Sequence, residues 1–497
     1  MIVHTNVIKA LLISSASMFL IGCQVQTIQG NGNIGSSKPV VGLDGSDQGE
    51  AATMGNIRPK IRRLTSVSTF SLRNTANDTT ISQTANVFDI DNDGENEVFI
   101  GFTGYRDYPD VPIMVLDTSG PTKNTAEQIF VDGVPTCNQC TMTIFTDLDG
   151  DGDKDLVLSD AGSDDAPFSG TAIEIAVNEG GVFRRITQQI EGQIFGIRSY
   201  ATAAGNLDGD SNGEIILSSG GDVKKSKVLE LRNGHLSIGR NKFVSSGVWE
   251  MFGIDNATNM QVHDIDGDGK NDLYVGGNWW NPNHLIFWSG LRASTPSVLP
   301  DSTAGHVDNR RAGSAAVIAG GDVISTAIDD FDLDGDSDIV AIIEMVTGNK
   351  NGSDYVNDYD HPSVIQVLKN NGYRRFVDIT DASSNNLGKR YFFQPLIYDL
   401  NQDGFNDIIF NYWSKADGSW AHNNKFGSLV LMNQGGLNFK RVEATSIPGY
   451  SSSLKGMIYP IAPTSAGTKI LVLQLRGGYA NSVNRQFSSY QAEIYFE

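Results

Sequence analysis

The chain has 497 residues, with 58 Asp and Glu against 37 Lys and Arg, and its formal net charge is −21 at pH 7. A protein with a diffuse negative field and no basic stripe does not hold nucleic acid through its phosphates, so this class of partner is excluded. The length corresponds to about three average domains, but a repeat that closes on itself can place all of it in one body. The acidic residues gather in short Asp clusters between apolar runs, and these clusters organise the chain.

Residues 1–22 have the pattern of an export signal, since the apolar run from Ala10 to Leu20 is too short to span a bilayer. The following sequence Leu20-Ile21-Gly22-Cys23 resembles the bacterial lipobox, which is cut before a cysteine that then carries lipid. The resemblance implies an exported protein, lipid-anchored to a membrane through Cys23. Gln24, in place of an Asp, favours the outer membrane. A cleaved signal peptide with an incidental cysteine is the alternative.

The next segment, residues 23–63, is rich in Gly, Ser, Asn and Gln and has little apolar periodicity. This composition predicts a flexible linker between the anchor and a folded domain. The remaining residues, 64–497, carry the repeats and are predicted to form one all-β domain.

Six segments of this domain have acidic or amide side chains at positions one, three, five and nine, directly before a short β-branched or aromatic run. Position six is glycine in five of them and Ser211 in the third, which makes the third the weakest match. The candidate metal ligands are Asp89, Asp91, Asp93 and Glu97; Asp147, Asp149, Asp151 and Asp155; Asn206, Asp208, Asp210 and Glu214; Asp264, Asp266, Asp268 and Asp272; Asp330, Asp332, Asp334 and Asp338; and Asp399, Asn401, Asp403 and Asp407.

Alternating carboxylates around a tight turn are the ligands that a hard cation requires, and a glycine at position six makes such a turn easily. An EF-hand would add a bidentate Glu at position twelve. That position is apolar in all six segments: Ile100, Leu158, Leu217, Val275, Ala341 and Phe410. We therefore expect up to six Ca²⁺ sites of another kind, with Mg²⁺ as an alternative that oxygen ligands also suit.

The acidic segments recur every 58 to 69 residues, which is long enough for a four-stranded antiparallel sheet and its connections. Pairs such as Asn178-Glu179-Gly180 and Asn370-Asn371-Gly372 predict a hairpin in the second half of each repeat. Residues 461–469 stand in the same register, 62 residues after Asp399, but contain no carboxylate. They predict a seventh repeat without a metal.

These repeats resemble the FG-GAP/VCBS family, which includes the head of integrin α chains and many bacterial surface proteins. The resemblance spans residues 64–497 and implies a seven-bladed β-propeller with four-stranded antiparallel blades. Each metal loop would join the first and second strands of its blade. We expect residues 491–496 to form the third strand of the seventh blade and residues 64–72 its outermost strand, which would close the ring.

In such a propeller, the loops between the second and third strands lie on the face opposite the metal loops. In this sequence several of these loops, and the starts of two inner strands, carry aromatic, amide and basic side chains. The candidates for a ligand-binding face are Tyr105, Tyr108, Trp279, Trp280, Asn283, Arg390, Tyr391, Trp413, Trp420 and His422. Aromatic rings beside amides suit stacking on a sugar. The alternative for each tryptophan is that it wedges a long loop between blades.

The predicted function is a calcium-stabilised, lipid-anchored surface protein that binds glycan or protein through this face. The first alternative is a polysaccharide lyase, because some lyases, including ulvan lyases, are seven-bladed propellers that use His, Tyr and Arg. The catalytic candidates would then be Arg198, Tyr200 and His284. The second alternative is a scaffold within an envelope complex.

Two further cysteines, Cys137 and Cys140, lead directly into an apolar run that ends at Phe145. In an exported protein we expect them to form a small disulfide. A redox role would need the pair at the start of a helix, and a zinc site would need two more ligands nearby. The sequence around the pair offers neither.

Overall fold

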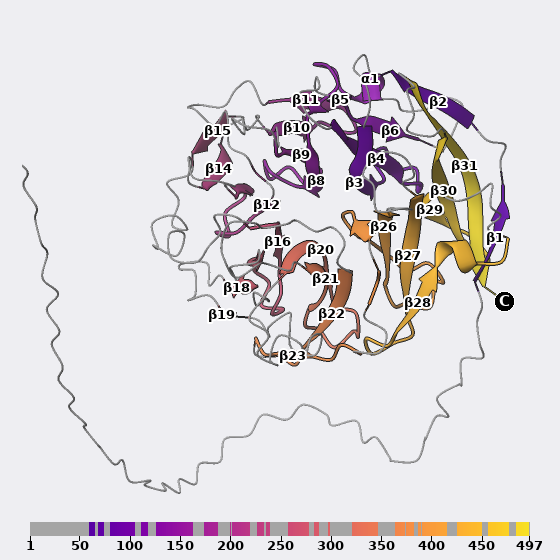
Figure 1. Cartoon of the computed structure of the whole chain (residues 1–497). Helices are drawn as coiled ribbons and strands as arrows, with labels where there is room; N and C mark the ends of the chain where they lie inside the picture. The colour runs from indigo at the N-terminus through magenta and orange to yellow at the C-terminus, as the bar shows by residue number, and fades with distance from the viewer. Residues whose placement is uncertain are drawn as a thin grey trace, which may run out of the picture. The chain divides into compact units, whose positions relative to one another are not determined.

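The computed structural model consists of antiparallel strands that form blades around a central axis (Figure 1). The folded unit spans Asn56–Glu497. The structure describes residues 59–64, 68–73, 80–104, 111–117, 126–162, 173–186, 199, 201–218, 226–232, 235–238, 257–277, 283–287, 297–298, 321–345, 363–372, 374–381, 386–388, 390–414, 425–449, 456–476 and 484–496. The predicted signal sequence and Cys23 lie outside these residues.

Seven blades follow one another along the chain. Blade 1 contains β3 (Thr80–Phe88), β4 (Glu97–Gly104) and β6 (Met114–Leu116), followed by helix α1 (Ala126–Ile129). Strand β5 (Val111–Pro112), which precedes β6 in the chain, pairs with β7 (Thr136–Cys137), which follows α1. Blade 2 contains β8 (Cys140–Thr146), β9 (Asp155–Asp160), β10 (Glu174–Asn178) and β11 (Phe183–Arg185). Blade 3 contains β12 (Thr202–Gly205), β13 (Glu214–Leu217), β14 (Lys227–Arg232) and β15 (His235–Ile238). Blade 4 contains β16 (Asn259–His263), β17 (Asp272–Gly276), β18 (His284–Ile286) and β19 (Ser297–Val298).

The last three blades complete the ring. Blade 5 contains β20 (Gly321–Asp329), β21 (Asp338–Met345), β22 (Ser363–Asn370) and β23 (Phe376–Asp378). Blade 6 contains a broken inner strand, β24 (Arg390–Phe392) and β25 (Leu396–Tyr398), then β26 (Asp407–Ser414), β27 (Lys425–Asn433), β28 (Phe439–Glu443) and the 3₁₀ turn η2 (Ala444–Ser446). Blade 7 contains β29 (Met457–Pro463), β30 (Gly467–Arg476), β31 (Asn484–Phe496) and the N-terminal strands β1 (Pro59–Arg63) and β2 (Ser68–Arg73). The predicted all-β, seven-bladed propeller with four-stranded antiparallel blades is confirmed.

The second strand of each blade is buried on both faces because it lies between the two neighbouring blades. This explains why an uninterrupted apolar run follows every acidic segment. Leu156, Val157 and Leu158 of β9 are fully buried, and Ile216 of blade 3 shares a core cluster with Leu273 of blade 4. Burial of each such aliphatic side chain stabilises the fold by about 1.5–3 kcal/mol.

The N-terminal strands close the ring on the C-terminal strand. Both β1 and β2 pair antiparallel with β31, in registers that place Pro59 opposite Phe496 and Ser68 opposite Ser489. The expected closure by residues 64–72 and the expected third strand at 491–496 are therefore observed, although β31 is longer. Strand structure begins earlier than expected, because β1 occupies the last residues of the segment 23–63 that was predicted to be linker.

A disulfide joins Cys137 and Cys140, whose Cα atoms are 5.5 Å apart, at the start of β8. Both side chains are fully buried. Among the described residues, no helix has the length and apolar character needed to cross a membrane.

Candidate metal centres

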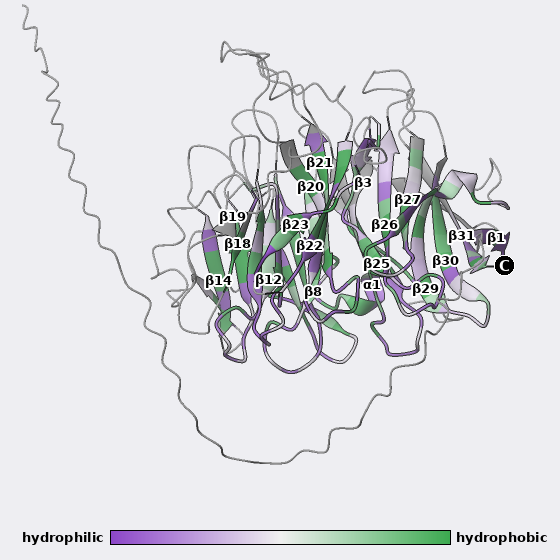
Figure 2. Cartoon of the chain, turned by 90° about the horizontal axis from the view of Figure 1, so that it is seen from below, coloured by the Kyte–Doolittle hydropathy of each residue, from purple (hydrophilic) through white to green (hydrophobic). Residues whose placement is uncertain are grey.

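The acidic loops share one position in the fold. Each joins the innermost strand of its blade to the second strand, so all six lie at the same end of the strands. Figure 2 shows hydrophilic loops at one end of the apolar strands. In five loops, three carboxylates approach within 4.8 Å of one another: Asp89, Asp91 and Glu97; Asp147, Asp149 and Asp155; Asp208, Asp210 and Glu214; Asp264, Asp266 and Asp272; and Asp330, Asp332 and Asp338. These clusters can each hold a metal ion.

Backbone amides fold the loop around the position-one carboxylate. In blade 1, Asp89 accepts hydrogen bonds from the amides of Asp93 at 3.1 Å and Gly94 at 3.0 Å. Asp93 in turn accepts one from the Glu95 amide at 2.8 Å. Gly94 has φ = +89°, which an L side chain adopts only with strain, so the glycine at position six is a conformational requirement.

Position four was not singled out from the sequence, yet its backbone is left-handed in all six loops. The residues there are Asn92, Gly150, Gly209, Gly267, Leu333 and Gln402, with φ between +57° and +81°. For Leu333 this conformation costs roughly 1–2 kcal/mol. The left-handed conformation was not predicted because the residue types at position four differ. Gly or Asn stands there in four of the six loops, which could have indicated it. In the third loop, where Ser211 replaces the glycine of position six, Gly209 at position four keeps the turn.

The position-nine carboxylate starts the second strand and is fully buried in all six blades. In five blades it accepts a hydrogen bond of 2.7–3.2 Å from the amide of position two. In blades 2, 5 and 6 the position-nine carboxylate accepts the amide of the hairpin asparagine, Asn178, Asn370 or Asn433, at 2.8–2.9 Å. The Asn–Gly hairpins seen in the sequence therefore help to hold the loop carboxylates.

Several of these buried oxygens have no hydrogen-bond partner, namely Oε1 of Glu97, Oε1 of Glu214 and Oδ2 of Asp338. Burial raises the pKa of Glu97 and Glu214 to about 8 and that of Asp338 to about 7, although a backbone hydrogen bond to each carboxylate opposes the rise. Burial likewise raises the pKa of Asp155 to about 7 and that of Asp407 to about 8. A buried carboxylate with an unpartnered oxygen is costly unless a cation faces it, so the chemistry of the site fits a bound metal.

The third and sixth loops depart from the pattern through an amide ligand. Asn206 donates a hydrogen bond to the backbone oxygen of Asp210 and accepts one from the Gly209 amide. The carboxylate cluster of this loop therefore consists of Asp208, Asp210 and Glu214. Asn401 donates to Oδ2 of Asp403 at 2.8 Å. Because Asn401 is an amide, the sixth loop has three carboxylates at its ligand positions instead of four. The turn around Asp399 is otherwise that of the first loop.

Neighbouring loops are also linked around the ring. The position-eight amides of Gly213 and Ser337 donate to position-two carbonyls of the preceding blade, at 2.9 and 3.2 Å. The Asn96 amide donates to the carbonyl of Ile461 at 2.8 Å, and Thr468 Oγ1 donates to that of Leu400 at 2.8 Å. These bonds join blade 7 to both of its neighbours at the level of the metal loops.

The loop of blade 7 lies where the seventh repeat was predicted and has protein hydrogen bonds in place of carboxylates. Thr464 Oγ1 accepts the Gly467 amide at 3.1 Å and is 2.6 Å from Oε1 of Glu493. Gln402 of blade 6 donates to the carbonyls of Thr464 and Gly467. The acidic loop of blade 6 and strand β31 therefore hold this turn.

The structure changes the expectation for part of the ligand-binding face. Trp413 lies in β26, is only 6 % exposed and belongs to a core cluster, where its ring stacks on that of Tyr391 with 5.6 Å between the ring centres. Asn283 is 6 % exposed and accepts the Gly277 amide. Arg390 lies over the Tyr412 ring and donates to Glu443 at 2.8 and 3.0 Å.

The other ligand-face and catalytic candidates lie outside the described residues. They are Tyr105, Tyr108, Arg198, Tyr200, Trp279, Trp280, Trp420, His422 and the side chain of His284. In chain order, Arg198 and Tyr200 come before the start of β12, and the other candidates in loops come after the ends of β4, β17 and β26. These ends of the strands are opposite the acidic loops.

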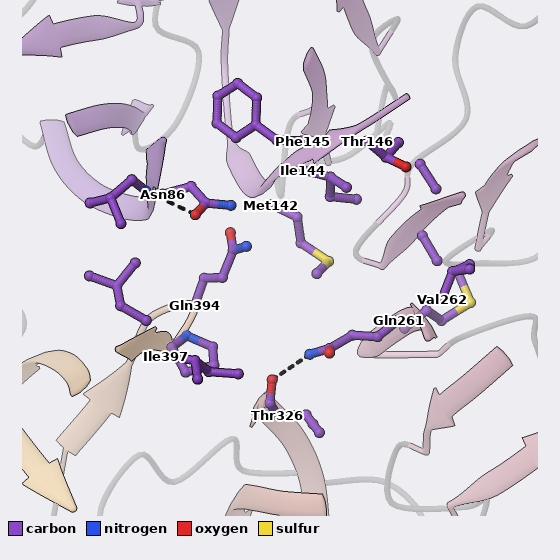
Figure 3. Close-up of a pocket in the computed structure, with 16 residues that line it drawn as sticks. Asn86, Met142, Ile144, Phe145, Thr146, Gln261, Val262, Thr326, Gln394 and Ile397 are labelled. Carbon is purple, nitrogen blue, oxygen red and sulfur yellow. Dashed lines mark hydrogen bonds between the residues drawn. The ribbon is translucent and has the colours of Figure 1, made fainter. Parts of the chain in front are cut away.

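The central channel contains a cavity of about 370 Å³ lined by innermost strands, and Figure 3 shows the amides of Asn86, Gln261 and Gln394 around it. Gln394 spans from blade 6 to blade 2. It accepts the Thr143 amide at 3.1 Å and donates to the Thr143 carbonyl at 2.9 Å, as a neighbouring strand would. Thr84 of blade 1 donates to the same Gln394 oxygen at 2.8 Å.

Comparisons with known sequences assign no relative to this chain: no protein-family model and no curated protein matches it. The fold and the acidic loops therefore define the class of this protein: it is a seven-bladed propeller with acidic clusters that can hold metal ions.

Proposed function

We propose that this protein is a calcium-stabilised propeller of the FG-GAP/VCBS type that binds a glycan or protein ligand at the bacterial cell surface. The observation that carries the metal assignment is the set of buried, unpartnered carboxylate oxygens in repeated loops of the same geometry. Only oxygen ligands are offered, which favours Ca²⁺ over transition metals. Up to six ions would be bound, by the loops of blades 1 to 6.

The ions would act on stability. A calcium ion bound between positions one, three, five and nine compensates the buried carboxylate and ties the turn between the first two strands of the blade. Because neighbouring loops are hydrogen-bonded around the ring, ordering one loop also supports the next. No group at these loops needs to take part in a reaction.

The ligand-binding part of the proposal is supported by the lipobox-like sequence ending at Cys23 and by the linker, which together suit a domain held outside the cell. It is further supported by topology, since the loops with Tyr105, Trp279 and Trp420 leave the strand ends opposite the metal loops. These loops are not needed for metal binding and are available for a ligand.

The metal assignment is tested by elemental analysis and calcium titration of the full chain after EDTA treatment and dialysis. We expect several equivalents of calcium per chain. No bound calcium at millimolar concentration would overturn the assignment.

The ligand is tested by screening the full chain against glycan arrays and polysaccharides, with calcium and with EDTA, while recording unsaturated product near 235 nm. Calcium-dependent binding without product supports the proposal. Product formation would instead show a lyase, and envelope proteins that co-purify without any glycan binding would show a scaffold.

A further inference from the structure

One hairpin of blade 5 brings two cationic side chains to two metal loops. Lys369, near the end of β22, donates through Nζ to Oδ2 of Asp334 at 3.0 Å and to Oδ2 of Asp332. Arg374, in the turn that follows, donates through Nε to Oδ2 of Asp266 in blade 4 at 2.5 Å. Lys369 therefore contacts positions three and five of the fifth loop, and Arg374 contacts position three of the fourth loop.

Both contacts are built into the fold. The side chains of Asp332 and Asp266 are each only 8 % exposed, so their charges face these cations largely shielded from water. The Arg374 guanidinium lies 4.3 Å from the centre of the Phe287 ring, and the backbone of Arg374 has φ = +64°. The cation–π contact and the conformation of the turn together fix the position of the Arg374 side chain. The hairpin is also tied to blade 4 by Asn370, whose Nδ2 donates to the carbonyl of Ile265 at 3.0 Å.

The fifth loop nevertheless remains a metal site. Asp330, Asp332 and Asp338 converge within 4.8 Å, and Oδ1 of Asp332 and Oδ2 of Asp338 are buried without a hydrogen-bond partner. Lys369 therefore holds one oxygen of Asp332 while the other is available to a cation. An ion in this loop would share the largely buried carboxylate of Asp332 with an ammonium group, and the two like charges would repel each other at this short range.

A lysine of another blade provides a contrast. Lys469 of blade 7 contacts Glu95 of the first loop at 2.6 Å through both carboxylate oxygens. Glu95 stands at position seven, outside the ligand positions, so this lysine does not compete with a metal.

We propose that Lys369 is an internal competitor for the metal and makes the fifth loop the weakest calcium site of the loops with four carboxylates. This inference rests on the proposed calcium function. Arg374 has a smaller effect of the same kind on the fourth loop, because it occupies one ligand position where Lys369 occupies two. The fifth loop then fills after the loops of blades 1, 2 and 4, at calcium concentrations that already saturate those three.

The test is isothermal titration of the EDTA-treated, dialysed full chain with calcium, comparing the wild type with Lys369→Met and Lys369→Gln. We expect the variants to bind the same number of ions as the wild type, with the affinity of one site, that of the fifth loop, raised at least tenfold. Lys469→Met is the matched control, and it should leave every affinity within about twofold. Circular dichroism in calcium verifies that each variant is folded.

Superimposable isotherms for the wild type and both Lys369 variants would overturn the role of Lys369 and leave the calcium sites standing. Absence of calcium binding in all proteins, the control included, would instead overturn the proposed metal function and this inference with it.

Discussion

The loops of blades 1 to 6 and the loop of blade 7 occupy the same place in the repeat but are held by different means. In blades 1 to 6 the second strand starts with a buried carboxylate, and other acidic side chains surround the turn. In blade 7 the turn is held by Thr464, Gln402 and Glu493 through direct hydrogen bonds. Blade 7 also keeps the hydrogen bond from position eight to the preceding blade, which is made here by Oγ1 of Thr468.

The difference shows that the propeller does not need a cation to make this turn. What the turn needs is a set of partners for its backbone, and blade 7 obtains these from its neighbour and from β31. In that blade the N-terminal strands β1 and β2 pair with the C-terminal strand β31, so a turn without carboxylates would keep the closure independent of any metal bound by the other loops. If the proposed calcium sites are correct, blades 1 to 6 should depend on the metal and blade 7 should not.

Removal of calcium from the full chain with EDTA should produce the largest effect. Each site at a hundredfold excess of calcium over Kd contributes about 2.7 kcal/mol. In addition, 22 of the 58 acidic residues stand at ligand positions and would repel one another without the ions. We expect the melting temperature measured by calorimetry to fall by at least about 10 °C and to recover when calcium is restored.

Hydrogen exchange under the same conditions sharpens the comparison. Amides of β29 and β30 should retain more protection in EDTA than amides of the second strands of blades 1 to 6. Equal loss of protection in all seven blades would contradict the independence of blade 7.

The metal-free protein should also lose stability as pH rises from 6 to 8. The pKa of Glu97, Glu214 and Asp407 is raised to about 8 in the folded state, above the value of about 4 for unfolded chains. The folded state therefore binds more protons than the unfolded state in this range, and its stability falls as these protons are lost. Melting curves in EDTA at pH 6 and pH 8 measure this. Calcium should weaken or reverse the trend, and a higher melting temperature at pH 8 in EDTA would refute the prediction.

Asp155→Ala tests a single metal-dependent loop. It leaves the buried amides of Leu148 and Asn178 without their acceptor, in addition to removing a ligand. We expect a loss of about 3 kcal/mol in the free energy of unfolding in EDTA, from the unpaired amides alone, and a larger loss in calcium. Urea denaturation in both conditions provides the two values. Equal losses would show that this carboxylate is structural only.

Thr464→Ala is the corresponding change in blade 7 and should have the smallest effect. It removes the hydrogen bond accepted from the Gly467 amide and the contact with Glu493, so a loss of about 1 kcal/mol is expected. The loss should be the same in calcium and in EDTA, as measured by urea denaturation. A loss that appears only in calcium would place a metal at blade 7.

The number and order of the blades, the position of the acidic loops and the seventh repeat without carboxylates could all be predicted from the sequence. These features are local, because carboxylates at alternate positions, a turn and an apolar run lie within about a dozen consecutive residues. Even so, the left-handed backbone at position four was hidden, since a side chain such as Leu333 does not reveal a conformation that the rest of the loop imposes on it.

The contacts between segments that are distant in the sequence became known from the folded structure. It buried Trp413 in the core, began the closing strand at Pro59 and joined Gln394 to Thr143, 251 residues away, across the channel. It also brought Lys369 to Asp334, 35 residues earlier, and Arg374 to Asp266, 108 residues earlier. Such contacts depend on the closure of the ring and on the packing of each blade against the next, and no local pattern of residues encodes them.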